Sequence, residues 1–149
     1  MPYSLVKGEA LIVEINDLPR NQMYKFGTTI VPWQNNLFWV GSNYEWNFTN
    51  DSPTDNFKLK TQQTLKQILK LPFKTHYHLS AVRPANIERR PFVGFHPKYK
   101  NIGVFNGMGT KGCSLTPYFA NEFVQHLLYN TPINKEVDIK RFEKVLSRN

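Results

Sequence analysis

The chain has 149 residues, of which 40% are hydrophobic and 14% aromatic, and its formal net charge is +8. This length is enough for a domain with a hydrophobic core, and this composition excludes an intrinsically disordered chain. No apolar run approaches the ~20 residues of a transmembrane helix, and the N-terminus lacks a signal-peptide pattern, so we expect no association with a membrane.

The basic residues are spread along the sequence and form no block of five like charges. Such a distribution favours a solvated basic surface, and we do not expect nucleic acid as a partner. The single cysteine, Cys113, excludes an internal disulfide and suits a reducing compartment. We therefore expect a cytoplasmic protein.

The sequence up to Gly41 predicts three strands, two of which form a hairpin. Glu9–Ile15 is almost continuously apolar, which is typical of a buried strand. Thr28–Pro32 and Leu37–Gly41 flank the turn residues Gln34–Asn36, and this arrangement is typical of a β-hairpin.

A helix and a further strand are predicted to follow. Thr54 suits the N-cap of the helix, and Pro72 lies beyond its end. Lys74–Val82 then alternates as a strand, with Tyr77, Leu79 and Ala81 on one face. The apolar positions of the helix recur every three or four residues, as on a buried helix face: Phe57, Thr61, Leu65, Ile68 and Leu69.

The composition changes at Arg83, and we place a domain boundary there, between residues 1–82 and 83–149. Arg83–Tyr99 contains three prolines and one glycine, which predicts an irregular segment with a short strand at Phe92–Val93. A strand over Ile102–Phe105 comes next. The predicted fold is thus α+β, with a mainly antiparallel sheet and a packed helix, followed by a strand, a glycine turn and a second helix.

The second helix is expected to have Thr116 as its N-cap and Pro117 at its first position. A short basic helix over Asp138–Leu146 is expected to follow. The buried stripe of the second helix is predicted to consist of Phe119, Ala120, Phe123, Val124, Leu127 and Leu128.

Three glycines, Gly107, Gly109 and Gly112, lie between the strand and the second helix. Glycine allows a positive φ and a close approach of the backbone to a ligand. A turn that opens a helix also presents free N–H groups and the positive end of the helix dipole, which suits an anionic or electron-rich group. A turn that only connects two elements is the alternative.

Six short motifs follow one another along nearly the whole chain. They are Lys7–Leu11, Ile30–Pro32, Trp39–Trp46, Ala81–Pro84, Arg90–Gly94, and Gly107–Gly112 with Leu115 and Pro117. Their order and spacing resemble the C-terminal half of the FAD-dependent D-amino-acid oxidase and glycine oxidase superfamily. The resemblance implies a substrate-domain part over residues 1–82 and the C-terminal part of an FAD-binding domain over residues 83–149.

Members of this family begin with a strand, a GxGxxG turn and a helix that bind the FAD pyrophosphate. Gly107, Gly109 and Gly112 have that spacing, but no acidic residue follows about 20 residues later within a βαβ unit, since Glu136 lies beyond the helix. The chain therefore resembles a member without its dinucleotide-binding half. That half, or a second copy of the chain, is the expected partner. The sequence leaves open whether the chain is a truncation, a gene fragment or a subunit of a split enzyme.

The resemblance implies that Arg83 binds a substrate carboxylate above the flavin. A guanidinium is always charged and pairs with a planar carboxylate through two hydrogen bonds. Tyr44 is a second substrate-binding candidate, because the tyrosine and histidine of some relatives are replaced here by Thr29 and Met108; Tyr24 is its alternative. A structural arginine and a core or rim tyrosine are the other interpretations. No catalytic side chain and no metal ligand is assigned.

The resemblance assigns flavin-ring contacts to Gly107, Met108, Gly109, Thr110, Lys111 and Gly112, and we expect Arg83 to face the same flavin. His76 and His78 could form part of a zinc site only with further ligands, so we expect a solvent-facing pair. Cys113 is expected to be a small buried thiol.

The implied function is the part of an FAD-dependent amine or amino-acid oxidoreductase that contacts the substrate and the flavin ring, with hydride transfer from a C–N carbon to the flavin. The chain alone is expected to be inactive and to bind FAD weakly or not at all. A non-catalytic binding or interaction module and a part of a tRNA-associated oxidase are the alternatives. If half of the protein is missing, Phe119, Phe123, Leu127 and Val104 should be under-buried or covered by a second copy.

Overall fold

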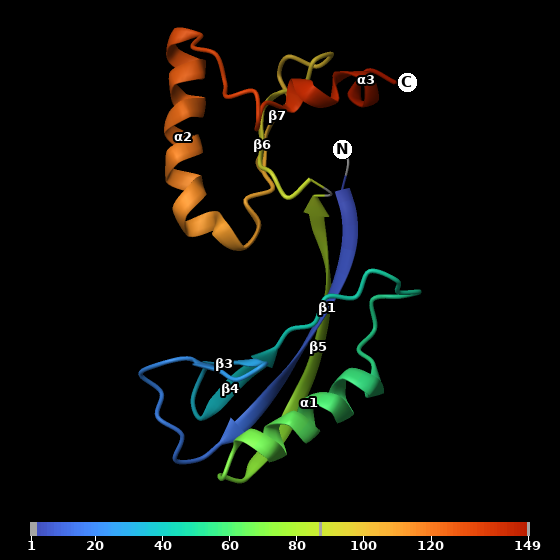
Figure 1. Ribbon diagram of the computed structural model, residues 1–149, viewed down its shortest axis with the longest axis vertical. Helices are drawn as coiled ribbons and strands as arrows, with labels where there is room; N and C mark the ends of the chain where they lie inside the picture. Colours follow the sequence, from blue (N-terminus) through green and yellow to red (C-terminus); the bar gives the residue numbers. More distant parts are fainter. Residues whose placement is uncertain (1–2, 87, 149) are drawn as a thin grey trace. The chain divides into compact units, whose positions relative to one another are not determined.

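The computed structural model describes residues 3–86 and 88–148, and it divides the chain into two compact units (Figure 1). One unit consists of Leu5–Arg83. The other contains Pro84–Asn149 together with the first residues of the chain, among them Tyr3 and Ser4. The division falls between Arg83 and Pro84; the assignment of a substrate part and an FAD-binding part stays a prediction.

The Leu5–Arg83 unit is built on a five-stranded sheet with the order β2-β3-β4-β1-β5. Antiparallel pairing joins β1 to β4 and β3 to β4, with Ala10 opposite Gly41 and Ile30 opposite Val40. This confirms the predicted hairpin and the α+β class. The strands are β1 (Tyr3–Ile15), β2 (Tyr24–Lys25), β3 (Thr29–Pro32), β4 (Leu37–Gly41) and β5 (Phe73–Asn86).

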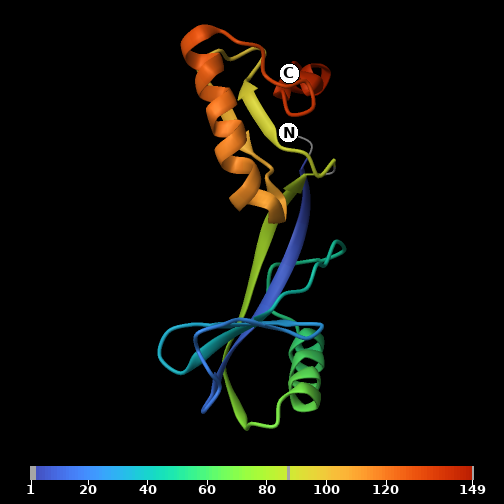
Figure 2. The same ribbon diagram turned by 60° about the vertical axis from the view of Figure 1, so that its left-hand side comes forward.

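Helix α1 (Asp55–Ile68) covers one face of this sheet, as the two views show (Figures 1 and 2). The predicted N-cap is confirmed, because the Thr54 hydroxyl accepts a hydrogen bond from Phe57 N at 3.3 Å. Leu65 of the helix is fully buried against alternate residues of the strands. The resulting core contains Leu11, Val13, Ile15, Ile30, Phe38, Val40 and Leu65.

The side chains of β5 stop alternating regularly between the two faces of the sheet near the middle of the strand. Thr75 accepts a hydrogen bond from Gln62 of α1 at 3.0 Å, and the His78 ring stacks on Phe57 of α1 with centroids 5.6 Å apart. Two residues three apart cannot share a face of a regular strand, so one extra residue is accommodated between them. Every side chain that follows is thereby moved to the opposite face.

This shift overturns the prediction of a solvent-facing histidine pair. The His78 side chain lies on the α1 side and is 14% exposed, whereas His76 is on the other side, 2.8 Å from Glu14 Oε2. The apolar residues of the strand take the opposite face instead. Tyr77 and Leu79 are 60% and 48% exposed, so an apolar surface of the sheet is left uncovered.

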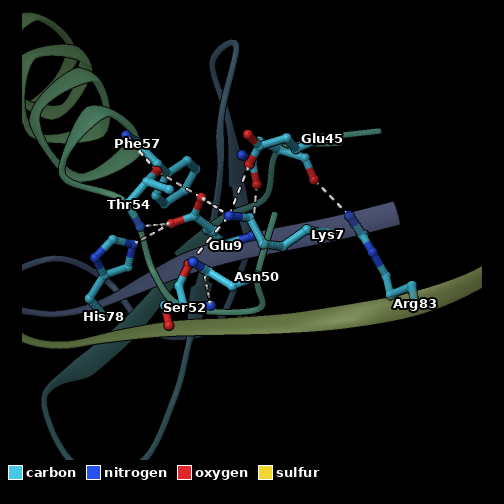
Figure 3. Close-up of polar contacts among 10 residues, drawn as sticks. Lys7, Glu9, Glu45, Asn50, Ser52, Thr54, Phe57, His78 and Arg83 are labelled. Carbon is cyan, nitrogen blue, oxygen red and sulfur yellow. Dashed lines mark hydrogen bonds and ion pairs between the residues drawn. The ribbon is translucent and has the colours of Figure 1, made fainter. Parts of the chain in front are cut away.

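Two charged residues of β1 are buried on the α1 side of the sheet, Lys7 and Glu9 (Figure 3). The Glu9 carboxylate accepts hydrogen bonds from Thr54 N at 2.6 Å and from Thr54 Oγ1 at 2.9 Å. Lys7 Nζ lies 3.8 Å from Glu9 Oε1 and 3.2 Å from Glu45 Oε2, and it donates to Ser52 O. His78 Nε2 lies 2.9 Å from Glu9 Oε2 without being aligned for a hydrogen bond. These contacts attach the start of α1 to the sheet.

The second unit packs a long helix, α2 (Gly112–Tyr129), against a two-stranded antiparallel sheet. This sheet consists of β6 (Phe92–Phe95) and β7 (Gly103–Asn106). The short helices η2 (Ile139–Phe142) and α3 (Glu143–Leu146) follow near the end of the chain, within the segment predicted to be helical. The core of this unit contains Val93, Phe119, Ile133 and Val137.

Helix α2 begins earlier than predicted. A 3₁₀ turn, η1 (Gly109–Lys111), leads directly into it at Gly112, so that Pro117 lies inside the helix. Thr116 as the N-cap and Pro117 at the first position are therefore wrong. The predicted strand is confirmed to within one residue at each end, because β7 covers Gly103–Asn106 where Ile102–Phe105 was expected. The predicted second helix is also confirmed, since α2 includes every residue of its expected apolar stripe.

The apolar stripe of α2 is only partly buried. Phe119 is 8% exposed, but Leu127 and Leu128 are 53% and 66% exposed. A continuous buried stripe is thus wrong, and the expected under-burial is confirmed at Leu127 but not at Phe119. Phe123 and Val104 are half-buried, and Cys113 is exposed, contrary to the prediction of a buried thiol.

None of the helices in the described part of the chain combines the length and the hydrophobicity that crossing a bilayer requires.

Replacement of Glu9 by alanine should strongly destabilise the Leu5–Arg83 unit. It leaves Lys7 Nζ and Thr54 N without the buried carboxylate, and the loss of one partner of a buried ion pair costs about 3–5 kcal/mol. Urea unfolding followed by circular dichroism measures the change. Glu14→Ala, which removes a partly exposed carboxylate, is the matched control and should cost less than about 1 kcal/mol. Equal effects of the two substitutions would contradict the prediction.

Candidate functional site

Arg83 lies on the face of the sheet that α1 does not cover. Leu11 and Val13 of β1 pack in the core on the α1 side, so Gly8 and Ala10 lie on the opposite side. Arg83 lies four residues after the exposed Leu79 on β5, so the two side chains share a face of the sheet, and Arg83 contacts Gly8 of β1. The shifted alternation of β5 therefore places the arginine on the uncovered face.

The guanidinium of Arg83 is held by the loop that follows β4. Its Nη2 donates to Asn43 O at 2.6 Å, and its Nη1 donates to Ser42 Oγ at 3.4 Å. Its Cζ lies 4.3 Å from the centre of the Tyr44 ring, which is cation–π geometry. Arg83 and Tyr44, the two residues predicted to bind substrate, thus contact one another. Tyr24 instead packs against the core and donates to Pro19 O.

The positive charge of Arg83 has no carboxylate partner among residues 3–86 and 88–148. Its Nε is buried and makes no hydrogen bond. A buried donor without an acceptor is costly, and a half-buried guanidinium normally pairs with an anion. The described residues therefore leave the charge of this half-buried guanidinium without a counter-ion.

Gly8 forms the floor beneath the guanidinium. A Cβ at this position would clash with Arg83 Nη2 and would lie 2.7 Å from Cζ, closer than any real contact. Gly8, Ser42 and Asn43 were not assigned roles from the sequence, although they belong to the motifs around Lys7–Leu11 and Trp39–Trp46. A glycine inside a strand is the signal that could have indicated this close approach.

The glycine turn belongs to the other unit and keeps a non-helical backbone where it leaves β7. Gly107 and Gly109 have φ values of +80° and +57°. Gly107 N donates to Asn106 Oδ1 at 2.6 Å, and Asn86 Nδ2 donates to Gly107 O at 3.2 Å and also to Arg90 O. Two asparagines that the sequence did not single out, Asn86 and Asn106, thus fix the turn.

The end of α2 that follows this turn is open to a ligand. No side chain caps η1 or α2, and Gly109, Thr110 and Lys111 are exposed. A Cβ on Gly109 would meet nothing within 4 Å. Uncapped N–H groups and the helix dipole favour negative charge there, and Lys111 adds a positive charge.

Since Arg83 and the glycine turn belong to different units, the expectation that both face one flavin stays a prediction. The described residues include no group of three histidines, cysteines or acidic residues that could hold a metal ion.

A scan against models of protein families finds no match. Solved oxidase structures have the same fold over nearly the whole chain. Iminodiacetate oxidase from Chelativorans has a TM-score of 0.69 at 17% identity, over 91% of this chain and 40% of that one. Glycine oxidase from Bacillus cereus has a TM-score of 0.69 at 16% identity, over 99% and 40%. Glycine oxidase from Geobacillus kaustophilus has a TM-score of 0.65 at 21% identity, again over 99% and 40%.

The chain therefore has the fold of a part of these oxidases, and it spans about 40% of their length. This confirms the fold that the resemblance of the sequence motifs implied.

Gly8→Ala should displace the Arg83 guanidinium without unfolding the chain, because the new methyl group occupies its place. The ¹⁵Nε–H resonance of Arg83 should shift or broaden in two-dimensional NMR spectra. Gly103→Ala is the matched control, since its Cβ would make only ordinary contacts of 3.4 Å or more. An unchanged Arg83 resonance in Gly8→Ala would show that the guanidinium does not rest on Gly8.

Proposed function

We propose that this chain is the substrate- and flavin-ring-contacting part of an FAD-dependent amine or amino-acid oxidoreductase. The observation that carries the proposal is Arg83, a half-buried guanidinium on the uncovered sheet face of an oxidase fold, which has no carboxylate partner in the described part of the chain. In this proposal Arg83 binds the carboxylate of a small amino acid, and Tyr44 borders the same site. The fold supports the class of oxidoreductase, and the geometry of Arg83 supports the anion.

The residues of the glycine turn suit a flavin ring. In the proposal the ring lies against Gly107–Gly112, where the exposed turn and the uncapped start of α2 offer N–H groups and Lys111 offers a positive charge. When bound, FAD would supply the acceptor for the hydride that leaves the carbon of the substrate C–N bond. The protein's contribution is to orient the substrate and to favour negative charge at the ring.

The proposal includes a dinucleotide-binding half in addition to these residues. The chain spans 40% of the matched oxidases, so such a half, on the same polypeptide or on another, would complete the enzyme, and these 149 residues alone would be inactive. A non-catalytic module that binds carboxylates through Arg83 is the second candidate. It is favoured because Arg83 and the residues that hold its guanidinium all belong to the Leu5–Arg83 unit.

Acetate or glycine should bind to the chain at Arg83, and the Arg83→Met variant should lose this binding. Charge-assisted hydrogen bonds contribute about 1.5–3 kcal/mol, so the affinity should fall at least roughly tenfold. Chemical-shift titration of the ¹⁵N-labelled chain measures it. The control is Arg20→Met, which removes another arginine that contacts backbone carbonyls and an aromatic ring. Equal binding by the wild type and Arg83→Met would refute the anion site.

The chain alone should bind FAD weakly or not at all. The pyrophosphate and ribose contacts of a dinucleotide site contribute much of the affinity, and the sequence contains no complete motif for them. Titration with FAD, followed by flavin fluorescence, tests this expectation. Saturable quenching at micromolar FAD would contradict the need for a dinucleotide-binding half. Amine-dependent reduction of FAD that occurs only when such a half is present would distinguish the enzyme from the non-catalytic module.

A further inference from the structure

We infer that Asn43 is a positioning residue that fixes the Arg83 guanidinium before a ligand binds. The inference rests on the proposed function, because it concerns how the proposed anion site is prepared. In this inference, Asn43 connects Arg83 to β1, the strand that carries the buried Lys7 and Glu9.

Asn43 uses its side chain and its backbone for different partners. Its Oδ1 accepts a hydrogen bond from Glu9 N at 2.7 Å, and its backbone carbonyl accepts one from Arg83 Nη2 at 2.6 Å. The first bond fixes the residue to β1, and the second holds the arginine of β5. A half-buried residue of a loop thus connects two strands of the sheet.

The loop is attached to β1 a second time two residues later. Lys7 N donates to Glu45 O, and Glu45 N donates to Lys7 O, both at 2.9 Å. The side chains of the same two residues form an ion pair of 3.2 Å, drawn in Figure 3. Since Asn43 and Glu45 both bind β1, Tyr44 between them is held over the guanidinium, although Tyr44 as a residue is 58% exposed.

This arrangement matters because an arginine side chain is flexible. A free arginine loses about 2 kcal/mol of rotamer entropy when a ligand immobilises it. A guanidinium already fixed by the Asn43 carbonyl, the Tyr44 ring and Gly8 has lost this freedom on folding, so the ligand binds more tightly. Removal of the Asn43 side chain frees the loop and hence the carbonyl that holds Arg83.

The test compares Asn43→Ala with Asn47→Ala, a control in the same loop region whose side chain is exposed. The Arg83 Nε–H signal is assigned by its loss in Arg83→Lys, and its heteronuclear NOE reports the order of the guanidinium. Asn43→Ala should lose the ordered signal and weaken acetate binding by roughly five- to tenfold, as expected for one hydrogen bond. Asn47→Ala should keep both, and Asn43→Asp, which retains the acceptor, should keep the ordered signal.

An ordered Arg83 signal in Asn43→Ala, with wild-type acetate affinity, would overturn the inference and leave the proposed anion site intact. An Arg83 signal that depends on Asn43 in a chain that binds no acetate would support the positioning role and refute the proposed function. If Asn43→Ala does not fold, as urea unfolding would show, Asn43→Ser makes the same comparison, because its shorter side chain cannot reach Glu9 N.

Discussion

The Leu5–Arg83 unit depends on the burial of Glu9. A carboxylate removed from water must be satisfied by hydrogen bonds and an opposite charge, or it destabilises the fold. Thr54 supplies two donors, and Lys7 supplies the charge from the same face of β1. Since Thr54 is also the N-cap of α1, the buried carboxylate determines where the helix begins relative to the sheet.

The same strand organises both sides of the sheet. Lys7 and Glu9 point toward α1, while Gly8 between them lies under the Arg83 guanidinium on the other side. The loop after β4 contacts residues of both sides. Its Glu45 side chain pairs with Lys7, which faces α1, and its Asn43 carbonyl accepts a hydrogen bond from Arg83 on the other side. The short motif Lys7–Gly8–Glu9 therefore combines a buried ion pair on one face of β1 with close contact to the Arg83 guanidinium on the other.

Local signals explain which parts of this structure the sequence predicts. The hairpin and the N-cap at Thr54 were predictable because each depends on residues close together in the chain. The glycine turn and its strand were predictable for the same reason, but the start of α2 was not, because an uncapped 3₁₀ turn carries no N-cap signal. The burial of Lys7 and Glu9 could not be predicted, because lysine and glutamate are seldom buried and their partners lie some forty residues away.

The candidate site could likewise be predicted from the sequence only in part. The resemblance selected Arg83 and Tyr44. Regular alternation along β5 predicted His76 and His78 on one face, but one extra residue places them on opposite faces of the sheet. That reversal has two consequences. It buries a histidine against Glu9, and it leaves Tyr77 and Leu79 exposed on the face that carries Arg83.

Exposed apolar residues on the same face as a guanidinium that has no carboxylate partner among the described residues would be costly as a permanent surface, because the apolar area stays hydrated and the charge lacks an anion. The proposed function removes both costs together, because an anionic substrate would pair with the guanidinium and a further part of the enzyme would cover the apolar residues. It therefore accounts for two features of this face that the contacts within the Leu5–Arg83 unit leave unexplained.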